Sequence, residues 1–242
     1  MDSVLLQVAK IFMIAILLSE IGCTKQPLTP VQIEEAQFKK DKFDSIVGIY
    51  GIMFIAGVVQ NNFIATGTVI RDKNNNLVIV TAGAERYKKA SNIYALRRVP
   101  KKIFNKLGNR TEFDEQKIPL ENIKNDLDSG LVILRPKVNC ENLFSKVIEI
   151  ANEKLYTGDQ LWFFHYKMKP EITNMATPIE LKSTSSGTAP KKNPIFMIEA
   201  RIGLGDIGAP LLNTSGELVG VVLGHDTEIA HWVYAINTFG LL

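Results

Sequence analysis

The sequence predicts an all-β fold, and two observations carry this prediction. From residue 45 onward, short runs rich in β-branched and aromatic residues recur, and clusters of glycine, asparagine and other polar residues separate them. The 242 residues are 46% hydrophobic and 22% charged, a composition typical of a packed globular protein with room for one large all-β domain or two small ones. The net charge of only +3 implies no general attraction to nucleic acid.

The first 22 residues have the features of an export signal. Their apolar run, residues 11–18, is too short to span a bilayer but suits the core of a signal peptide. Residues 19–24 resemble a bacterial lipobox in which Cys23 would be lipidated, although Glu20 stands where a leucine is usual. We therefore expect residues 1–22 to be a signal peptide of the lipoprotein type, and the protein to be exported and anchored to a bacterial membrane, in the periplasm or at the cell surface. An ordinary cleaved signal and an uncleaved anchor are the alternatives.

Residues 23–44 predict a tether between this signal and the body of the chain. The stretch is polar, contains two prolines and has a charged run at residues 34–42; a short helix packed on the domain is the alternative. No spacing between the two cysteines, Cys23 and Cys140, and the three histidines resembles a zinc or redox motif. We expect no disulfide, no metal and no cofactor.

The body, residues 45–242, is expected to consist of strands and turns. A polar cluster at residues 72–76 between two apolar runs predicts a hairpin. Residues 183–193, rich in serine, threonine and lysine, predict a flexible loop. The runs expected as strands are 46–50, 53–59, 63–70, 77–82, 128–134, 158–166, 194–200, 221–225 and 232–236.

One short motif near the carboxyl end has a specific resemblance. Residues 205–210 read Gly-Asp-Ile-Gly-Ala-Pro and resemble the nucleophile loop of trypsin-like (chymotrypsin-fold) serine peptidases, Gly-Asp-Ser-Gly-Gly-Pro. In that family two backbone amides of the loop form the oxyanion hole, and the amides of Gly205 and Ile207 stand in their place. Ile207 also stands at the position of the serine. A branched hydrocarbon has no proton to lose and no lone pair to attack with, so acyl transfer cannot begin there.

Two further motifs match the same family. Residues 66–70 and 81–84 resemble the strand and the Thr-Ala-Ala-His segment that carry the general base, and Ala84 stands where the histidine should be. A methyl group cannot accept the proton of a serine. Residues 128–134 resemble the Asp-Ile-Ala-Leu-Leu strand, whose aspartate, here Asp128, orients the histidine. The three positions occur in the order and at the separations typical of the family's histidine, aspartate and serine.

The resemblance covers residues 45–242 and implies two antiparallel β-barrels of the chymotrypsin type. It implies a degenerate member of the family that lacks the catalytic histidine and serine. In activated enzymes the aspartate at position 206 pairs with a new amino terminus beginning Ile-Val-Gly. Here Ser45, rather than a lysine or arginine, precedes residues 46–48, so we expect these residues to form an ordinary first strand and Asp206 to bond local amides.

Other side chains do not replace the missing groups in this alignment. Ser129 lies beside Asp128, and three histidines fall outside the positions that face the family's cleft: His165, His225 and His231. A lone histidine near a strand end is far more often structural or solvated than catalytic. No rewired triad is expected.

Two surfaces remain as candidate binding sites. The strand after the nucleophile loop lends backbone groups to an extended peptide in the family, and Leu223, Gly224 and His225 are the residues at that place; an edge covered by the chain's own loops is the alternative. A basic block between residues 86 and 110 has nine basic residues and no acidic one. It would contact an anionic surface ligand unless it is simply solvated. The residues proposed for that contact are Arg86, Lys88, Lys89, Arg97, Arg98, Lys101 and Lys102.

The expected function is that of a catalytically inactive trypsin-like peptidase homologue, a pseudopeptidase. It would be an exported lipoprotein that binds a protein, a peptide or a surface ligand rather than nucleic acid. An active serine-type endopeptidase with unusual catalytic groups is the first alternative. A structural envelope protein is the second.

Overall fold

The computed structural model describes residues 42, 44–105, 108–127, 129–144, 146–152, 159, 161–164, 179–180, 195–199, 203, 205–225 and 232–238. The chain divides into two compact units, residues 1–37 and 38–242, and every described residue belongs to the second. Within that part of the chain, no helix is long and apolar enough to cross a membrane. The elements are β1 (Ile46–Ile55), β2 (Val58–Arg71), β3 (Leu77–Ala82), α3 (Ala84–Lys88), β4 (Ala90–Asn105), β5 (Gly108–Asn125), β6 (Leu131–Pro136), the 3₁₀ turn η1 (Glu141–Leu143), β7 (Trp162–Phe163), β8 (Ile179–Glu180), β9 (Ile195–Glu199), β10 (Pro210–Leu212), β11 (Leu218–His225) and β12 (Trp232–Asn237).

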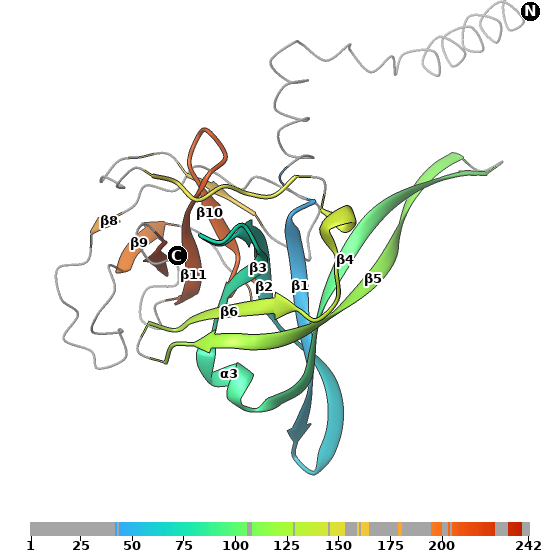
Figure 1. The fold of residues 1–242 in the computed structure, drawn as a ribbon, viewed down its shortest axis with the longest axis horizontal. Helices are drawn as coiled ribbons and strands as arrows, with labels where there is room; N and C mark the ends of the chain where they lie inside the picture. Colours follow the sequence, from blue (N-terminus) through green and yellow to red (C-terminus); the bar gives the residue numbers. More distant parts are fainter. Residues whose placement is uncertain are drawn as a thin grey trace, which may run out of the picture. The chain divides into compact units, whose positions relative to one another are not determined.

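Strands β1 to β6 close into an antiparallel barrel (Figure 1). Their order is β1-β2-β3-β6-β5-β4, and β4 pairs back onto β1, with Gly48 opposite Leu96. The hairpin predicted around residues 72–76 joins β2 to β3. Its turn is fixed by the carboxylate of Asp72, which accepts hydrogen bonds from the backbone amides of Asn74 and Asn76, both at 2.9 Å.

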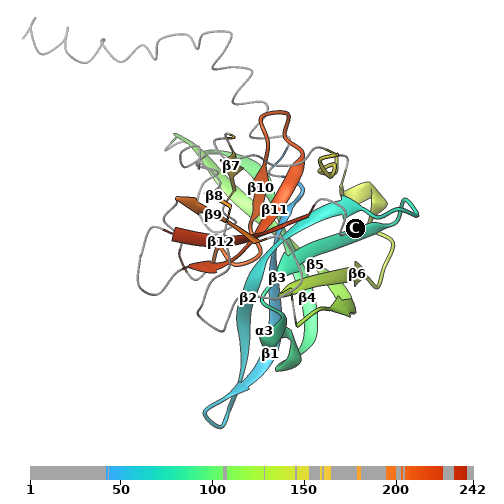
Figure 2. The same cartoon turned by 90° about the vertical axis from the view of Figure 1, so that its left-hand side faces the viewer.

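The other strands form a six-stranded sheet in the order β7-β10-β11-β12-β9-β8. Figures 1 and 2 show this sheet beside β2 and β3 of the barrel. The predicted all-β class is confirmed. Where two barrels are expected, however, the described residues form one closed barrel and one open sheet.

The packing explains why β3 reads as an unbroken apolar run. Successive side chains of a strand point to opposite faces. Leu77 and Ile79 pack in the core inside the barrel, whereas Val78, Val80 and Ala82 pack in a second core together with residues of β10, β11 and β12. Every residue of β3 is therefore buried, which is the pattern of a strand covered on both sides.

Two expectations about the strands need correction. Residues 53–59 are not one strand, because the chain turns at Ala56 and Gly57, both of which have positive φ (50° and 83°). Positive φ at both central residues is the geometry of a two-residue hairpin. No strand was expected in the basic block either, yet most of it lies in β4, which forms a long hairpin with β5.

Candidate functional site

The loop at residues 205–208 is held between the barrel and the sheet by hydrogen bonds. The backbone amide of Thr66 in β2 donates to the Ile207 carbonyl at 2.7 Å, and the Thr66 hydroxyl donates to the Gly205 carbonyl at 2.7 Å. On the other side, the Gly208 amide donates to the carbonyl of Val222 in β11 at 2.8 Å. The shape of this loop is therefore fixed by groups other than the side chain at position 207.

Gly208 sits in the tightest part of the loop. Its φ is +82°, and a Cβ built on it would overlap the Thr66 carbonyl oxygen and the Thr81 hydroxyl. These two atoms are themselves joined, because the Thr81 hydroxyl donates to the Thr66 carbonyl at 2.6 Å, and the Tyr87 hydroxyl lies 3.3 Å from the Thr81 oxygen. The sequence motif indicated a glycine here but not the hydroxyl groups that surround it.

Asp206 is bonded within its own turn. Its carboxylate accepts a hydrogen bond from the Gly203 amide at 2.6 Å, and its carbonyl accepts one from the Ala209 amide at 2.9 Å. Ile46 is the first residue of β1 and pairs with Thr68. The structure thus confirms Ile46 as part of an ordinary first strand and Asp206 as a residue that bonds a local amide.

Ile207 lies where the two halves of the domain meet. Its half-buried side chain packs against the core inside the barrel and also against the core shared with the sheet. A Cβ built on Gly83 would lie 3.3 Å from Cγ2 of Ile207. Gly83 precedes Ala84, the buried first residue of α3. The structure therefore brings Ile207 to the turn that carries Ala84.

The segment that contains Asp128 lies against the Gly83 turn, although Asp128 itself lies outside the described residues. The Gly83 amide donates to the Gly130 carbonyl at 3.0 Å, and a Cβ built on Gly130 would lie 3.2 Å from Cδ2 of Leu223. Ser129 is fully buried, and its hydroxyl accepts a hydrogen bond from the Leu131 amide at 3.2 Å. Ser129 is therefore engaged in the turn and is not placed as a nucleophile.

The hydroxyl groups described near the loop are also unsuited to nucleophilic attack. Those of Thr66, Thr81 and Tyr87 are buried and hydrogen-bonded. Burial raises the pKa of Tyr87, and its contact with the Thr81 hydroxyl offsets this only in part. A nucleophile needs an adjacent base or a lowered pKa, so none of these groups is activated. The described residues also contain no group of three metal-ligating side chains.

The strand edge at residues 223–225 is open in the described part of the chain. Strand β10 pairs with β11 at residues 218–221, and the Gly208 and Val222 bonds extend this contact by one residue. On its other edge β11 pairs with β12, as far as His225 opposite Val233. A Cβ built on Gly224 would meet nothing within 4 Å. The predicted peptide-binding residues Leu223, Gly224 and His225 thus have one edge without a described partner strand.

Two residues of the basic block lie opposite glutamates across the β4–β5 hairpin. Arg98 lies opposite Glu115, with 3.7 Å between its Nε and the Glu115 Oε1, and Lys101 lies opposite Glu112. Arg97 donates to the Gln116 side chain at 3.3 Å. The proposed anionic ligand would therefore meet less net positive charge on β4 than the run of basic residues suggests.

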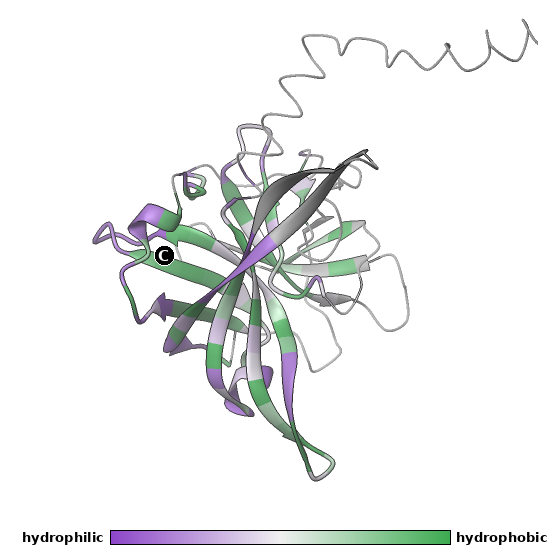
Figure 3. Ribbon diagram, turned by 90° about the vertical axis from the view of Figure 1, so that its right-hand side faces the viewer, coloured by the Kyte–Doolittle hydropathy of each residue, from purple (hydrophilic) through white to green (hydrophobic). Residues whose placement is uncertain are grey.

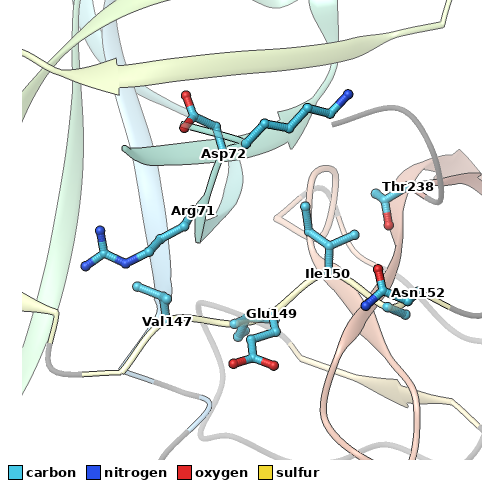
Figure 4. Close-up of a pocket in the computed structure, with 10 residues that line it drawn as sticks. Arg71, Asp72, Val147, Glu149, Ile150, Asn152 and Thr238 are labelled. Carbon is cyan, nitrogen blue, oxygen red and sulfur yellow. The ribbon is translucent and has the colours of Figure 1, made fainter. Parts of the chain in front are cut away.

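A cavity of about 650 Å³ lies away from this site (Figure 4). The β2–β3 turn, residues 147–152 and Thr238 line it. At its wall, Nη2 of Arg71 pairs with Oε2 of Glu141 at 2.6 Å, so the arginine charge is already neutralised. No residue of the 205–208 loop or of the Gly83 turn lines this cavity.

Solved structures with the same fold include several bacterial serine proteases. The inactive form of the Rv3671c protease is 17% identical, with a TM-score of 0.56 over 86% of this chain and 90% of that chain. The HtrA-type protease AlgW with a tripeptide is 14% identical, with a TM-score of 0.60 over 84% of this chain and 59% of that chain. The serine endoprotease from Yersinia pestis is 18% identical, with a TM-score of 0.55 over 88% and 64%. Protein-family models and characterised protein sequences give no match.

These similarities establish the fold of the chain as that of the trypsin-like serine proteases, including the HtrA type. The fold expected from three short motifs is confirmed. At identities of 14–18% the likeness says nothing about whether this chain cleaves peptides. The chemistry of the site depends on its own residues and not on the fold alone.

The buried Tyr87 predicts a loss of stability at high pH. Its pKa in the folded protein is raised above the usual value of 10.0, so below pH 10 the hydroxyl is protonated in both the folded and the unfolded state and does not change the free energy of unfolding. Above pH 10 the unfolded chain ionises first, and the free energy of unfolding falls by about 1.4 kcal/mol per pH unit. Urea melts between pH 8 and 11.5 should show this fall. Tyr87→Phe should have a shallower slope above pH 10; an unchanged slope would mean that Tyr87 is ionised in the folded state.

Proposed function

We propose that this chain is a pseudopeptidase, a trypsin-like domain that binds a protein or peptide without cleaving it. The observation that carries this proposal is the packing of Ile207. Its hydrocarbon side chain occupies the seam between the two cores, beside the turn that carries Ala84. Loss of serine or histidine from such a triad lowers turnover by about a million-fold, and loss of both costs little more.

The ligand is proposed to add as an extended strand along residues 223–225. Strand addition uses main-chain hydrogen bonds, which do not depend on catalytic side chains. The edge opposite β12 and the open space at Gly224 support this mode of binding. Leu223 and Ile207, both half-buried, would give such a peptide an apolar surface to cover.

The test of inactivity uses the wild-type chain. We expect no turnover of casein or of a fluorogenic peptide library, and no labelling by a fluorophosphonate probe, because none of the described hydroxyl groups near the 205–208 loop is activated. Labelling that is lost on heat denaturation would defeat the proposal and favour an active endopeptidase with unusual catalytic groups.

The test of peptide binding uses Gly224. A random peptide display selected on the wild-type chain should yield peptides that bind in extended form. Gly224→Tyr should weaken them roughly tenfold or more, since a bulky aromatic side chain would fill the open space that the peptide covers. Gly224→Ala, which meets nothing within 4 Å, is the matched control and should keep most of the affinity. Equal binding by both variants would place the ligand elsewhere.

We also propose that the protein is exported and held at a bacterial membrane by a lipid on Cys23. The apolar run at residues 11–18 and the small residue before Cys23 support this proposal. Mass spectrometry of the protein from a bacterial membrane fraction should find an acylated amino-terminal Cys23. Recovery of an unmodified soluble chain would contradict it.

A further inference from the structure

The hairpin of β1 and β2 ends in an apolar tip that extends beyond the barrel. The last pair between β1 and its barrel neighbour β4 is Met53 with Ala90, so residues 54–59 have only one another as strand partners. At about 3.3 Å per residue, the tip reaches roughly 10 Å past that pair. Figures 1 and 2 show it projecting from one end of the barrel.

Most of the exposed large hydrophobic side chains of the described residues lie in the tip. Phe54 is 73% exposed, Val59 67%, Val58 52% and Ile55 46%, and only three other large apolar side chains in that part of the chain are similarly exposed. Figure 3 shows the tip coloured as hydrophobic. Between Asp44 and Arg71 the sequence has no charged residue. Water is a poor solvent for such a segment, and patches of this kind usually mark an interaction site.

Both faces of the tip are apolar, and this indicates the kind of partner. Phe54 pairs with Val59 and Ile55 with Val58, and successive residues of a strand face opposite sides. A groove on another protein would cover one face and leave the other in water. A fluid apolar medium surrounds both faces at once.

The surroundings of the tip limit how deeply it can enter such a medium. The outer edges of residues 54–59 have no strand partner among the described residues, and unpaired backbone groups are not tolerated in the hydrocarbon core of a bilayer. Gln60, Asn61 and Asn62 form a polar band directly above it. The Asn61 side chain donates to the hydroxyl of Tyr94 at 2.6 Å, so this band is ordered. These features suit a segment that reaches the boundary of head groups and acyl chains, about 5–10 Å deep.

Basic residues lie at the same end of the barrel. Helix α3 ends at Lys88, and Lys89 directly precedes Ala90, the partner of Met53. Both lysines are exposed. Lys88 lies 3.3 Å from Glu85, the acidic residue of this helix, and the guanidinium of Arg86 is turned inward to donate to the Ile64 carbonyl at 2.9 Å. Lys89 can thus contact an anion, and Lys88 forms only an exposed ion pair with Glu85.

We propose that the β1–β2 tip inserts into the interface of an anionic lipid bilayer, with Lys88 and Lys89 contacting the head groups. This contact would orient the domain on the membrane surface. It depends neither on the proposed pseudopeptidase function nor on a lipid at Cys23.

The test places a tryptophan at the tip of the full-length chain. Phe54→Trp is conservative at an exposed position, and Val138→Trp, at an exposed apolar residue outside the hairpin, is the matched control. With vesicles that contain phosphatidylglycerol and lipids brominated near the head group, the emission of Phe54→Trp should be quenched more than that of the parent chain, whose own Trp162 and Trp232 lie outside the hairpin. The emission of Val138→Trp should show no such additional quenching.

The charge contribution is measured in the same assay. Lys88→Gln with Lys89→Gln in the Phe54→Trp chain should raise the lipid concentration for half-quenching, by about fivefold per lysine that contacts the membrane. The effect should vanish on zwitterionic vesicles. A vesicle-bound Phe54→Trp chain whose emission is quenched no more than that of the parent chain would overturn the proposal. So would an emission shift that depends on protein concentration without lipid, since the occupant of the tip would then be a second copy of the chain.

Discussion

Gly208→Ala is expected to prevent the domain from folding stably. The new methyl group would overlap the Thr66 carbonyl and the Thr81 hydroxyl, and the Gly208 backbone has a left-handed φ of +82°. A left-handed conformation costs an alanine about 1–2 kcal/mol. The overlap adds more, because the two oxygen atoms are tied to each other and cannot move apart freely. The total should exceed about 4 kcal/mol, which is a large part of the stability of a typical domain.

Gly57→Ala provides the matched control. Gly57 has almost the same φ, +83°, but a Cβ there would meet nothing within 4 Å. Urea denaturation followed by circular dichroism should therefore show a loss of only about 1–2 kcal/mol for Gly57→Ala. If the two variants unfolded at the same urea concentration, the 205–208 loop would not be seated against β2 and β3 as described.

Ile207→Ser combined with Ala84→His is expected to give the chain weak hydrolytic activity. Ile207→Ser supplies a hydroxyl on a loop whose backbone is already fixed by Thr66 and Val222. It also removes the branched side chain beside Gly83, which frees space for an imidazole. General-base catalysis contributes about 10²–10⁴-fold, so the double variant should exceed Ile207→Ser alone by about a hundredfold or more.

The measurement is turnover of a fluorogenic peptide, with the fluorophosphonate probe to count active sites. Ile207→Ser alone should stay at background, because a methyl group at position 84 leaves no base. In the double variant Asp128 would orient the introduced histidine, as the family resemblance implies. Strong labelling of the single variant would show that some other group acts as the base.

The parts of the fold that sequence predicted well are those with local chemical signals. The turn after β2 was visible because aspartate and asparagine bond their own backbone, and the Asp72 bonds show this mechanism. The turn at Ala56 and Gly57 was missed, because an alanine with positive φ gives no such signal within a run of apolar residues. The β4–β5 hairpin was missed because a run of basic residues gives no strand signal by itself, and the pairing of Arg98 with Glu115 and of Lys101 with Glu112 appears only across the two strands.

The candidate site was also predictable only in part. The positions of its residues could be found from motifs, since Gly205 to Pro210, Ala84 and the segment of Asp128 match short patterns. The contacts that hold these residues together could not be predicted from the sequence. The bonds from Thr66 to Ile207 and from Gly83 to Gly130 join residues far apart in the chain, and no local pattern predicts such pairs. The packing of Ile207 against two cores is likewise a property of the assembled domain.

The closed barrel occupies a continuous part of the chain, from Ile46 to Pro136, and this has a consequence for biosynthesis. All strand partners within the barrel emerge before the 205–208 loop, whether from the ribosome or from an export channel. Domains generally fold as the chain emerges, with the amino-terminal part first. The barrel would then already present the Thr66 amide and hydroxyl as a template onto which the late-synthesised loop docks.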